Sequence, residues 1–181
     1  MAILPIRTFG DPALRERARP VEKVTDVHQQ LIDDMIETMR DAPGVGLAAP
    51  QVGVLERIFV WEVDEEHGAV INPRIVTSSA DTAEEEEGCL SLPGLYYPVE
   101  RPAAVVVEGL DRHGQPVQLD ATELLARVCQ HEIDHLDGVL FVDRLREPLK
   151  KEALQRLRDQ ALGLEPAPAS TAPAAPREEI L

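Results

Sequence analysis

The chain has 181 residues, of which 18 are Lys or Arg and 33 are Asp or Glu, so its formal charge is −15. This length predicts one domain with a short extension, and 44% hydrophobic residues is ordinary for a globular protein. Aromatic residues make up only 3%. An acidic chain with few stacking side chains is a poor binder of phosphate backbones, so we expect no DNA partner.

The cysteine count and the apolar runs bear on the compartment. Cys89 and Cys129 are too few for a disulfide framework. The amino-terminal residues lack the basic start and long apolar stretch of a secretory signal. No segment approaches the roughly 18 consecutive apolar residues that a membrane span needs. We therefore expect a cytoplasmic protein that reaches no membrane.

The amino-terminal half predicts one helix and two strands. Residues 25–40 carry apolar side chains at three- and four-residue steps, which is typical of an amphipathic helix. Strands are expected at 58–63 and at 70–76, the second interrupted at Pro73. We interpret the acidic run 81–87 as a solvated loop.

The carboxyl-terminal half predicts a hairpin followed by two helices. The hairpin is expected within 103–119, and the helices at about 122–135 and about 148–162. Pro and Ala dominate residues 163–181, which predicts a disordered tail. The fold class expected for residues 1–162 is α+β, with a central helix packed against antiparallel β-sheets and a C-terminal helix.

The expected central helix carries the motif His-Glu-Ile-Asp-His. His131 and His135 lie four residues apart, so both imidazoles project from one helix face and can bind one metal ion. Glu132 can reach a water on that metal rather than the metal itself. The alternative is a helix with two surface histidines and a solvated glutamate.

Two histidines do not complete a catalytic site, so the third ligand decides the class of enzyme. An extended metallopeptidase motif would place a histidine where this chain has Phe141, and Glu147 and Glu152 are the later candidates. Cys89 is the better candidate because the glycine before it allows close approach. Cys129 projects away from the histidine face and is expected to be a small buried residue. A structural metal module would need a fourth protein ligand, and none is evident.

Three segments resemble, in the family's order, the signature segments of peptide deformylases. They are GVGLAAPQVG at 44–53, EGCLSLPG at 87–94 and QHEIDHLDG at 130–138, and the resemblance covers about residues 1–160. It implies hydrolysis of the formyl group from the N-formylmethionine that starts nascent chains, with release of formate. N-formylmethionyl peptides are therefore the expected partners.

The resemblance also implies a role for each matching residue. The metal ligands would be Cys89, His131 and His135, with the fourth position left to water. Glu132 would take a proton from that water and pass it to the departing amine. The side-chain amide of Gln51 and the backbone N–H of Leu90 would stabilise the oxyanion. Taken alone, Gln51 would be a loop amide that satisfies nearby backbone.

The peptide substrate needs an extended partner and an apolar pocket. The substrate backbone can pair with Val45 and Gly46. Leu124 and Val128 lie on the metal-facing side of the central helix, and Arg127 can add its aliphatic stem. Plain core packing is the alternative role of Leu124 and Val128.

Three further expectations concern the surroundings of the site. Glu87 and Arg101 resemble a charge pair that braces the Cys89 loop in the family, whereas sequence alone favours a surface pair of little weight. The family is associated with Fe2+, and the ligand set also suits Zn2+, Ni2+ or Co2+. Residues 144–158 hold six Lys or Arg against two Glu, a net charge of +4. Ribosome contact through this segment follows from the resemblance, with an ordinary solvated helix as the alternative.

Overall fold

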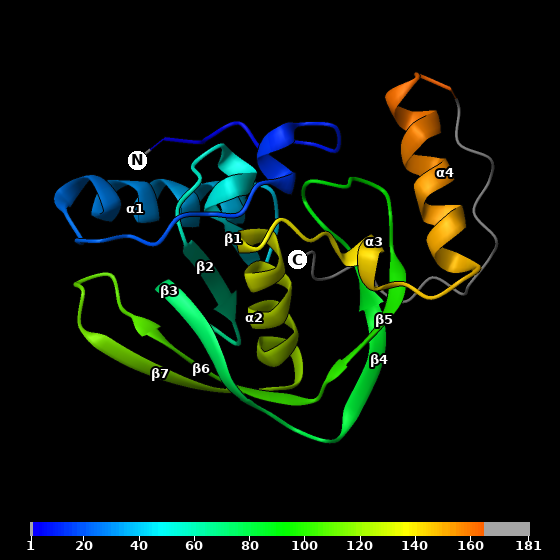
Figure 1. Cartoon of the computed structure of the whole chain (residues 1–181). Helices are drawn as coiled ribbons and strands as arrows, with labels where there is room; N and C mark the ends of the chain where they lie inside the picture. Colours follow the sequence, from blue (N-terminus) through cyan, green and yellow to red (C-terminus); the bar gives the residue numbers. More distant parts are fainter. Residues whose placement is uncertain (1, 165–181) are drawn as a thin grey trace.

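The structure is a computed structural model that describes residues 2–164 (Figure 1). The α+β class expected from the sequence is confirmed, while the predicted tail from residue 165 onward lies outside the described residues. In chain order the elements are η1 (Pro12–Arg15), α1 (Asp26–Asp41), β1 (Gly46–Ala48), η2 (Ala49–Val52), β2 (Ile58–Val63), β3 (Glu66–Ser78), β4 (Thr82–Glu87), β5 (Tyr97–Pro102), β6 (Ala104–Leu110), β7 (Pro116–Thr122), α2 (Glu123–Leu136), α3 (Phe141–Arg144) and α4 (Leu149–Ala161).

Two antiparallel sheets surround the central helix α2 (Figure 1). The larger sheet has the strand order β1-β2-β3-β6-β7, and β4 pairs with β5 in a separate two-stranded sheet. Helix α2 contacts strands of both sheets. Strand β1 pairs only with β2 and is therefore an edge of the larger sheet, with Gly46 opposite Trp61.

The larger sheet is buried on both faces near β2. Phe59 and Trp61 belong to the apolar cluster that includes residues of α2, whereas Ile58 and Val60 belong to the cluster that includes residues of α1. Successive strand residues face opposite sides. The apolar run in β2 therefore packs against α2 on one face of the sheet and against α1 on the other.

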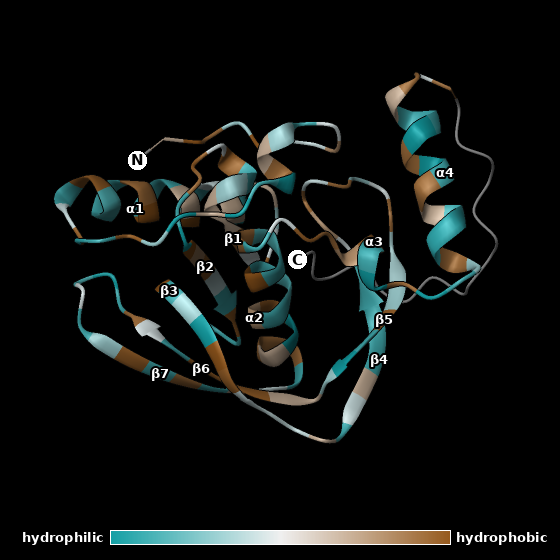
Figure 2. Ribbon diagram, in the orientation of Figure 1, coloured by the Kyte–Doolittle hydropathy of each residue, from teal (hydrophilic) through white to brown (hydrophobic). Residues whose placement is uncertain are grey.

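Helix α2 is enclosed from Ala126 to Leu136, where every residue is buried. Figure 2 shows hydrophilic as well as hydrophobic bands along this helix. A polar side chain inside a protein must find a hydrogen-bond partner or a ligand. The polar residues of α2 are therefore either paired within the protein or available to bind something else.

Two local predictions are wrong. Residues 81–87 are interpreted above as a loop, but Thr82–Glu87 form β4 and pair with β5, with Glu84, Glu85 and Glu86 exposed. Strand β3 is not broken at Pro73; it continues through a shift of register between Ile71 and Arg74. The predicted hairpin and helices are confirmed, and no helix within residues 2–164 has the length and apolarity to cross a membrane.

Candidate metal centre and active site

Three buried side chains from two segments converge beside α2. The ligand atoms of Cys89, His131 and His135 all lie within 4.8 Å of one another, and Sγ of Cys89 is 3.3 Å from Nε2 of His135. Nε2 of His131 is buried and has no hydrogen-bond partner among the described residues. One thiol and two imidazoles are a donor set for a divalent transition metal. The residues therefore fit a metal ion.

The geometry follows from the helix and from the loop after β4. His131 and His135 are one turn apart, and their ring centroids lie 4.9 Å from each other. The ring of Phe141 stacks against His131 at a centroid distance of 6.2 Å. The residue at the third-histidine position of a metallopeptidase motif thus packs against the site and supplies no ligand.

Burial disfavours charge on the cluster. It raises the pKa of the Cys89 thiol and lowers the pKa of His135 well below its usual range, with the neighbouring His131 as a further cause for His135. A bound divalent cation reverses this balance for a thiol, because it stabilises the thiolate directly. The cluster is therefore better suited to bind a cation than to carry a positive charge on a protonated imidazole.

Glu132 is a buried carboxyl group without a partner. Neither Oε1 nor Oε2 has a hydrogen-bond partner among the described residues. Burial raises its pKa well above the usual range, and the negative charge of Glu87 adds to the effect. A buried carboxyl group whose pKa is raised and whose oxygens have no protein partner is a candidate general acid or base.

Gln51 is held in one orientation in η2. Its Oε1 accepts a hydrogen bond from the backbone N–H of Ala48 at 2.8 Å. Its Nε2 lies 3.2 Å from Oγ of Ser91 and 3.8 Å from Sγ of Cys89. The oxygen thus bonds nearby backbone, which is the alternative role given above for Gln51. The amide N–H groups face the Cys89 segment, which also contains Leu90.

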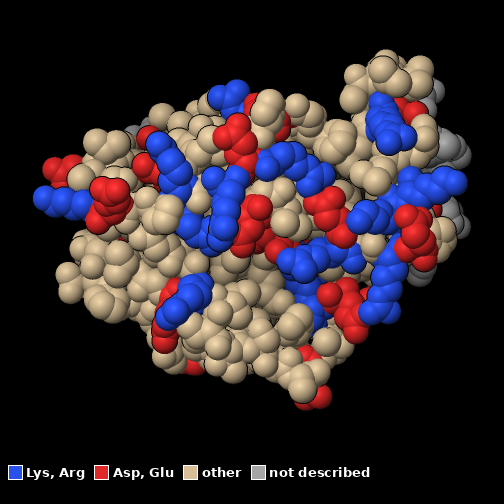
Figure 3. Space-filling view, in the orientation of Figure 1, with Lys and Arg blue, Asp and Glu red and all other residues tan. Residues whose placement is uncertain are grey.

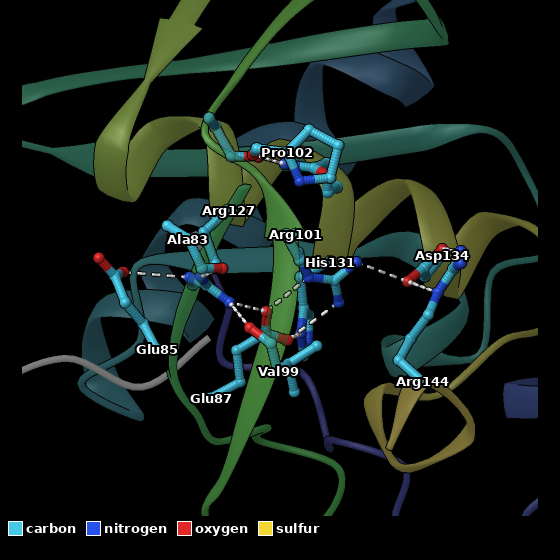
Figure 4. A network of polar contacts seen from close by, with 12 residues as sticks. Ala83, Glu85, Glu87, Val99, Arg101, Pro102, Arg127, His131, Asp134 and Arg144 are labelled. Carbon is cyan, nitrogen blue, oxygen red and sulfur yellow. Dashed lines mark hydrogen bonds and ion pairs between the residues drawn. The ribbon is translucent and has the colours of Figure 1, made fainter. Parts of the chain in front are cut away.

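Glu87 is the centre of a buried polar network (Figure 4). It accepts hydrogen bonds from Arg101 through both carboxylate oxygens and from Nη1 of Arg127 at 2.7 Å. Its Oε2 also lies 3.0 Å from Nδ1 of His131. A carboxylate accepts, so Nδ1 donates, and the lone pair of His131 is on Nε2, facing the cluster.

The sequence-based default for Glu87 and Arg101 is wrong, because both residues are buried. Burial alone would raise the pKa of Glu87. Hydrogen bonds from His131 and Arg101 outweigh burial and hold this pKa well below its usual range. The network therefore keeps a carboxylate next to Nδ1 of His131, on the side of the ring away from Nε2.

The residues predicted to contact the substrate differ in where they lie relative to Glu132 and the apolar cluster. Gly46 faces Glu132, while Val45 and Leu124 pack against the apolar cluster that contains Val128. The guanidinium of Arg127 reaches the β4–β5 sheet (Figure 4), where it donates hydrogen bonds to the carbonyl oxygens of Val99 and Ala83. Ser91, which accepts a hydrogen bond from Gln51, is not among the site residues predicted from the sequence. The only sequence feature that could have indicated it is its position two residues after Cys89.

The rival ligand sets are not assembled. Among residues 2–164 the cluster consists of three ligands. Cys129 is buried in an apolar cluster, as expected. Glu152, a candidate third ligand of a peptidase, accepts a hydrogen bond from the hydroxyl of Tyr97 instead. Three protein ligands are the pattern of a catalytic site rather than of a structural one.

Comparisons with known proteins agree on one family. The sequence model for polypeptide deformylase matches residues 3–151. A peptide deformylase of Acidothermus cellulolyticus is 52% identical over 159 residues, which is 88% of each chain. The crystal structure of a peptide deformylase from Legionella pneumophila has a TM-score of 0.83 at 44% identity, covering 89% of this chain and 96% of that one. For the peptide deformylase of Thermus thermophilus the TM-score is 0.82 at 46% identity, with 88% and 94% covered.

Proposed function

Because this chain belongs to the polypeptide deformylase family, whose members are metal-dependent hydrolases, we propose that Cys89, His131 and His135 hold its catalytic metal ion. The enzyme removes the formyl group from the N-formylmethionine of nascent polypeptides and releases formate. The assignment of these three ligands rests on their close approach within the protein interior and on Nε2 of His131, which has no hydrogen-bond partner among the described residues. When bound, the metal supplies Lewis-acid chemistry and activates water.

Glu132 is the group we assign to proton transfer. Its two carboxyl oxygens are free of protein partners among the described residues, so the ionised group is available to accept a proton from a water beside it. One oxygen takes a proton from the attacking water, and the same proton then goes to the nitrogen that leaves the formyl carbon. Glu132 is fully buried, so its carboxyl group is shielded from bulk solvent.

Stabilisation of the formyl oxygen is assigned to Gln51 and Leu90. As the carbonyl is attacked, its oxygen gains negative charge and needs donors that are already aimed at it. Nε2 of Gln51 is such a donor, because Ala48 and Ser91 fix the amide. The backbone N–H of Leu90, which follows Cys89 directly, is the second donor we propose.

The substrate peptide is proposed to bind along β1. This strand is the edge of the larger sheet, so the backbone at Val45 and Gly46 can pair with an extended peptide. Leu124, Val128 and the aliphatic stem of Arg127 are proposed to contact the methionine side chain. The apolar surroundings of Val128 support this role for the first two residues.

The native metal is proposed to be Fe2+, with Zn2+, Ni2+ or Co2+ in purified protein. A thiolate with two imidazoles suits all four ions. The proposed compartment is the cytoplasm, where nascent chains are made. Metal analysis of protein purified without oxygen tests the first point, and a preparation with full activity but no iron would contradict it.

Ribosome contact through residues 144–158 is a separate proposal. Four of the basic residues have partners within the chain. Arg144 binds Asp134, Arg146 binds Glu100, Lys150 donates to the carbonyl oxygen of Asp143 at 3.2 Å, and Arg156 lies 3.4 Å from the hydroxyl of Tyr97. Other basic residues of α4 are exposed, among them Lys151 and Arg158. These exposed side chains are the ones we propose to meet RNA.

The proposed function is tested by formate release from a formyl-Met peptide with anaerobically prepared protein. Glu132→Gln should keep the metal but lower turnover by about a hundredfold or more, since the proton carrier is lost. Cys89→Ser should lose both metal and turnover. Wild-type turnover in the Gln variant would refute the role of Glu132, and no formate from the wild-type protein would refute the reaction.

A further inference from the structure

A continuous chain of ion pairs, ending in a hydrogen bond, leads from the surface at α3 to His131 (Figure 4). Nε and Nη2 of Arg144 donate to the Asp134 carboxylate at 3.0 and 2.5 Å. Nη1 of Arg101 donates to the same carboxylate at 2.9 Å. The remaining donors of Arg101, Nε and Nη2, bind Glu87, which accepts from Nδ1 of His131.

Arg101 serves two carboxylates at once. The side chains of Glu87 and Asp134 are only 0% and 10% exposed, so a single guanidinium between them leaves one negative charge uncompensated in the interior. Arg127 supplies a second cation at Glu87. Arg144 supplies the second cation at Asp134 and gives Oδ1 of that residue its hydrogen bond.

Loss of Arg144 would change the hydrogen bonds that Arg101 makes to Asp134 and Glu87. Oδ1 of Asp134 would lose its partner, and a buried carboxylate oxygen without a donor is costly. Asp134 would then compete with Glu87 for the paired donors of Arg101. A looser Glu87 would in turn hold Nδ1 of His131 less firmly, and metal affinity depends on such outer hydrogen bonds.

We propose that Arg144 is a positioning residue for the metal centre, acting through Asp134, Arg101 and Glu87 on His131. The inference rests on the proposed function, because the metal is the one held by Cys89, His131 and His135. The Arg144 side chain is 50% exposed, so its replacement leaves most of the core untouched. The effect is therefore expected in metal binding rather than in folding.

The test measures Co2+ binding to metal-free protein by competition with a chelator, together with the visible absorption of the bound Co2+. Arg144→Gln should weaken Co2+ affinity about tenfold and shift the absorption bands. Arg144→Lys keeps the charge but lacks the planar pair of N–H donors that matches two carboxylate oxygens, so its affinity should fall in between. Arg146→Gln is the matched control: it removes an arginine paired with the surface residue Glu100 and should stay within about twofold of wild type.

An Asp134→Asn background tests the route. If Arg144 acts through Asp134, Arg144→Gln should have little further effect there, because the two changes interrupt one connection. Wild-type affinity and spectrum in Arg144→Gln, or an undiminished loss in the Asn background, would overturn the inference. If the Gln variant does not fold, Arg144→Lys decides: weaker binding supports the inference, and wild-type binding overturns it.

Failure of the proposed function looks different. Wild-type protein that takes up no Co2+, or Cys89→Ser protein that binds it as tightly as wild type, would refute the metal centre itself. Normal Co2+ binding by the wild type, with the loss confined to Cys89→Ser, would leave the centre intact and refute only the role of Arg144.

Discussion

At the scale of single residues, Gly46 is a position where an added side chain would collide with Glu132. A Cβ atom there would lie 2.4 Å from Oε1 of Glu132 and 3.0 Å from Cγ1 of Val128. Both distances are shorter than ordinary van der Waals contact. The bare backbone of β1 therefore lets the carboxyl group of Glu132 stay beside the cluster.

Gly46→Ala is expected to lower turnover of a formyl-Met peptide by about a hundredfold, because a small displacement of a reacting group has effects of that size. Metal content should stay at the wild-type level. Gly68→Ala is the control, since its Cβ would meet only the Trp61 ring at 3.0 Å. Steady-state kinetics on both variants decide: equal losses would contradict a specific effect on Glu132.

Cys89 and Cys129 are both buried and free, but we expect substitution of each to have a different effect on metal binding. Burial raises the pKa of Cys129 to about 12, and its side chain belongs to an apolar cluster. Cys129→Ala should lower the free energy of unfolding by about 1 kcal/mol and leave metal binding unchanged. Urea unfolding and metal analysis check this, and loss of metal from Cys129→Ala would contradict the ligand assignment.

The residues that sequence reasoning misplaced are those whose environment depends on several segments. Arg127 does lie on α2, but its guanidinium reaches β4 and β5, which no helical spacing encodes. Glu87 appears as the last residue of an acidic run. Only the fold reveals that two arginines and His131 surround it.

At the scale of elements, amphipathic helices are easier to recognise than the small sheet. Helix α1 buries one face, so its apolar spacing is plain in the sequence. Strand β4 exposes most of its carboxylates and is held by pairing with β5, so it has no apolar alternation to recognise. A strand stabilised by its partner rather than by its own burial is hidden from local patterns.

The end of α2 depends on Gly138. Its φ is +75°, and a Cβ atom would lie 2.6 Å from the backbone oxygen of Arg15. Gly138→Ala should lower the free energy of unfolding by about 3 kcal/mol, because strain and a backbone clash act together. Gly163→Ala, with a φ of +68° but nothing within 4 Å, should lose only about 1 kcal/mol. Urea unfolding checks both, and equal losses would contradict the clash.

At the scale of the whole molecule, acidic and basic side chains are interspersed on the face that Figure 3 shows. Figure 3 shows them in contact with one another over α3 and the neighbouring strands. Many of these charges are paired, so the +4 of residues 144–158 overstates what is free to meet a partner. Sequence counts charges correctly but does not show which are already neutralised.

The ribosome proposal predicts salt-dependent pelleting of the protein with ribosomes. Lys151→Ala together with Arg158→Ala should remove it, because these are the exposed basic residues of α4 and fewer phosphate contacts release fewer counterions. The control combines Lys23→Ala with Arg74→Ala, which changes the net charge equally at exposed positions outside this segment. Unchanged pelleting of the first variant, or equal loss from both, would contradict the proposal.

The central claim concerns the atoms that surround the metal ion. X-ray absorption spectroscopy at the zinc edge of Zn2+-loaded protein measures them directly. One sulfur and two imidazole nitrogens are expected, with the sulfur absent from the Cys89→Ser protein and retained in Cys129→Ala. A metal shell without sulfur in the wild type, or a shell that the Cys89 substitution leaves unchanged, would contradict the account.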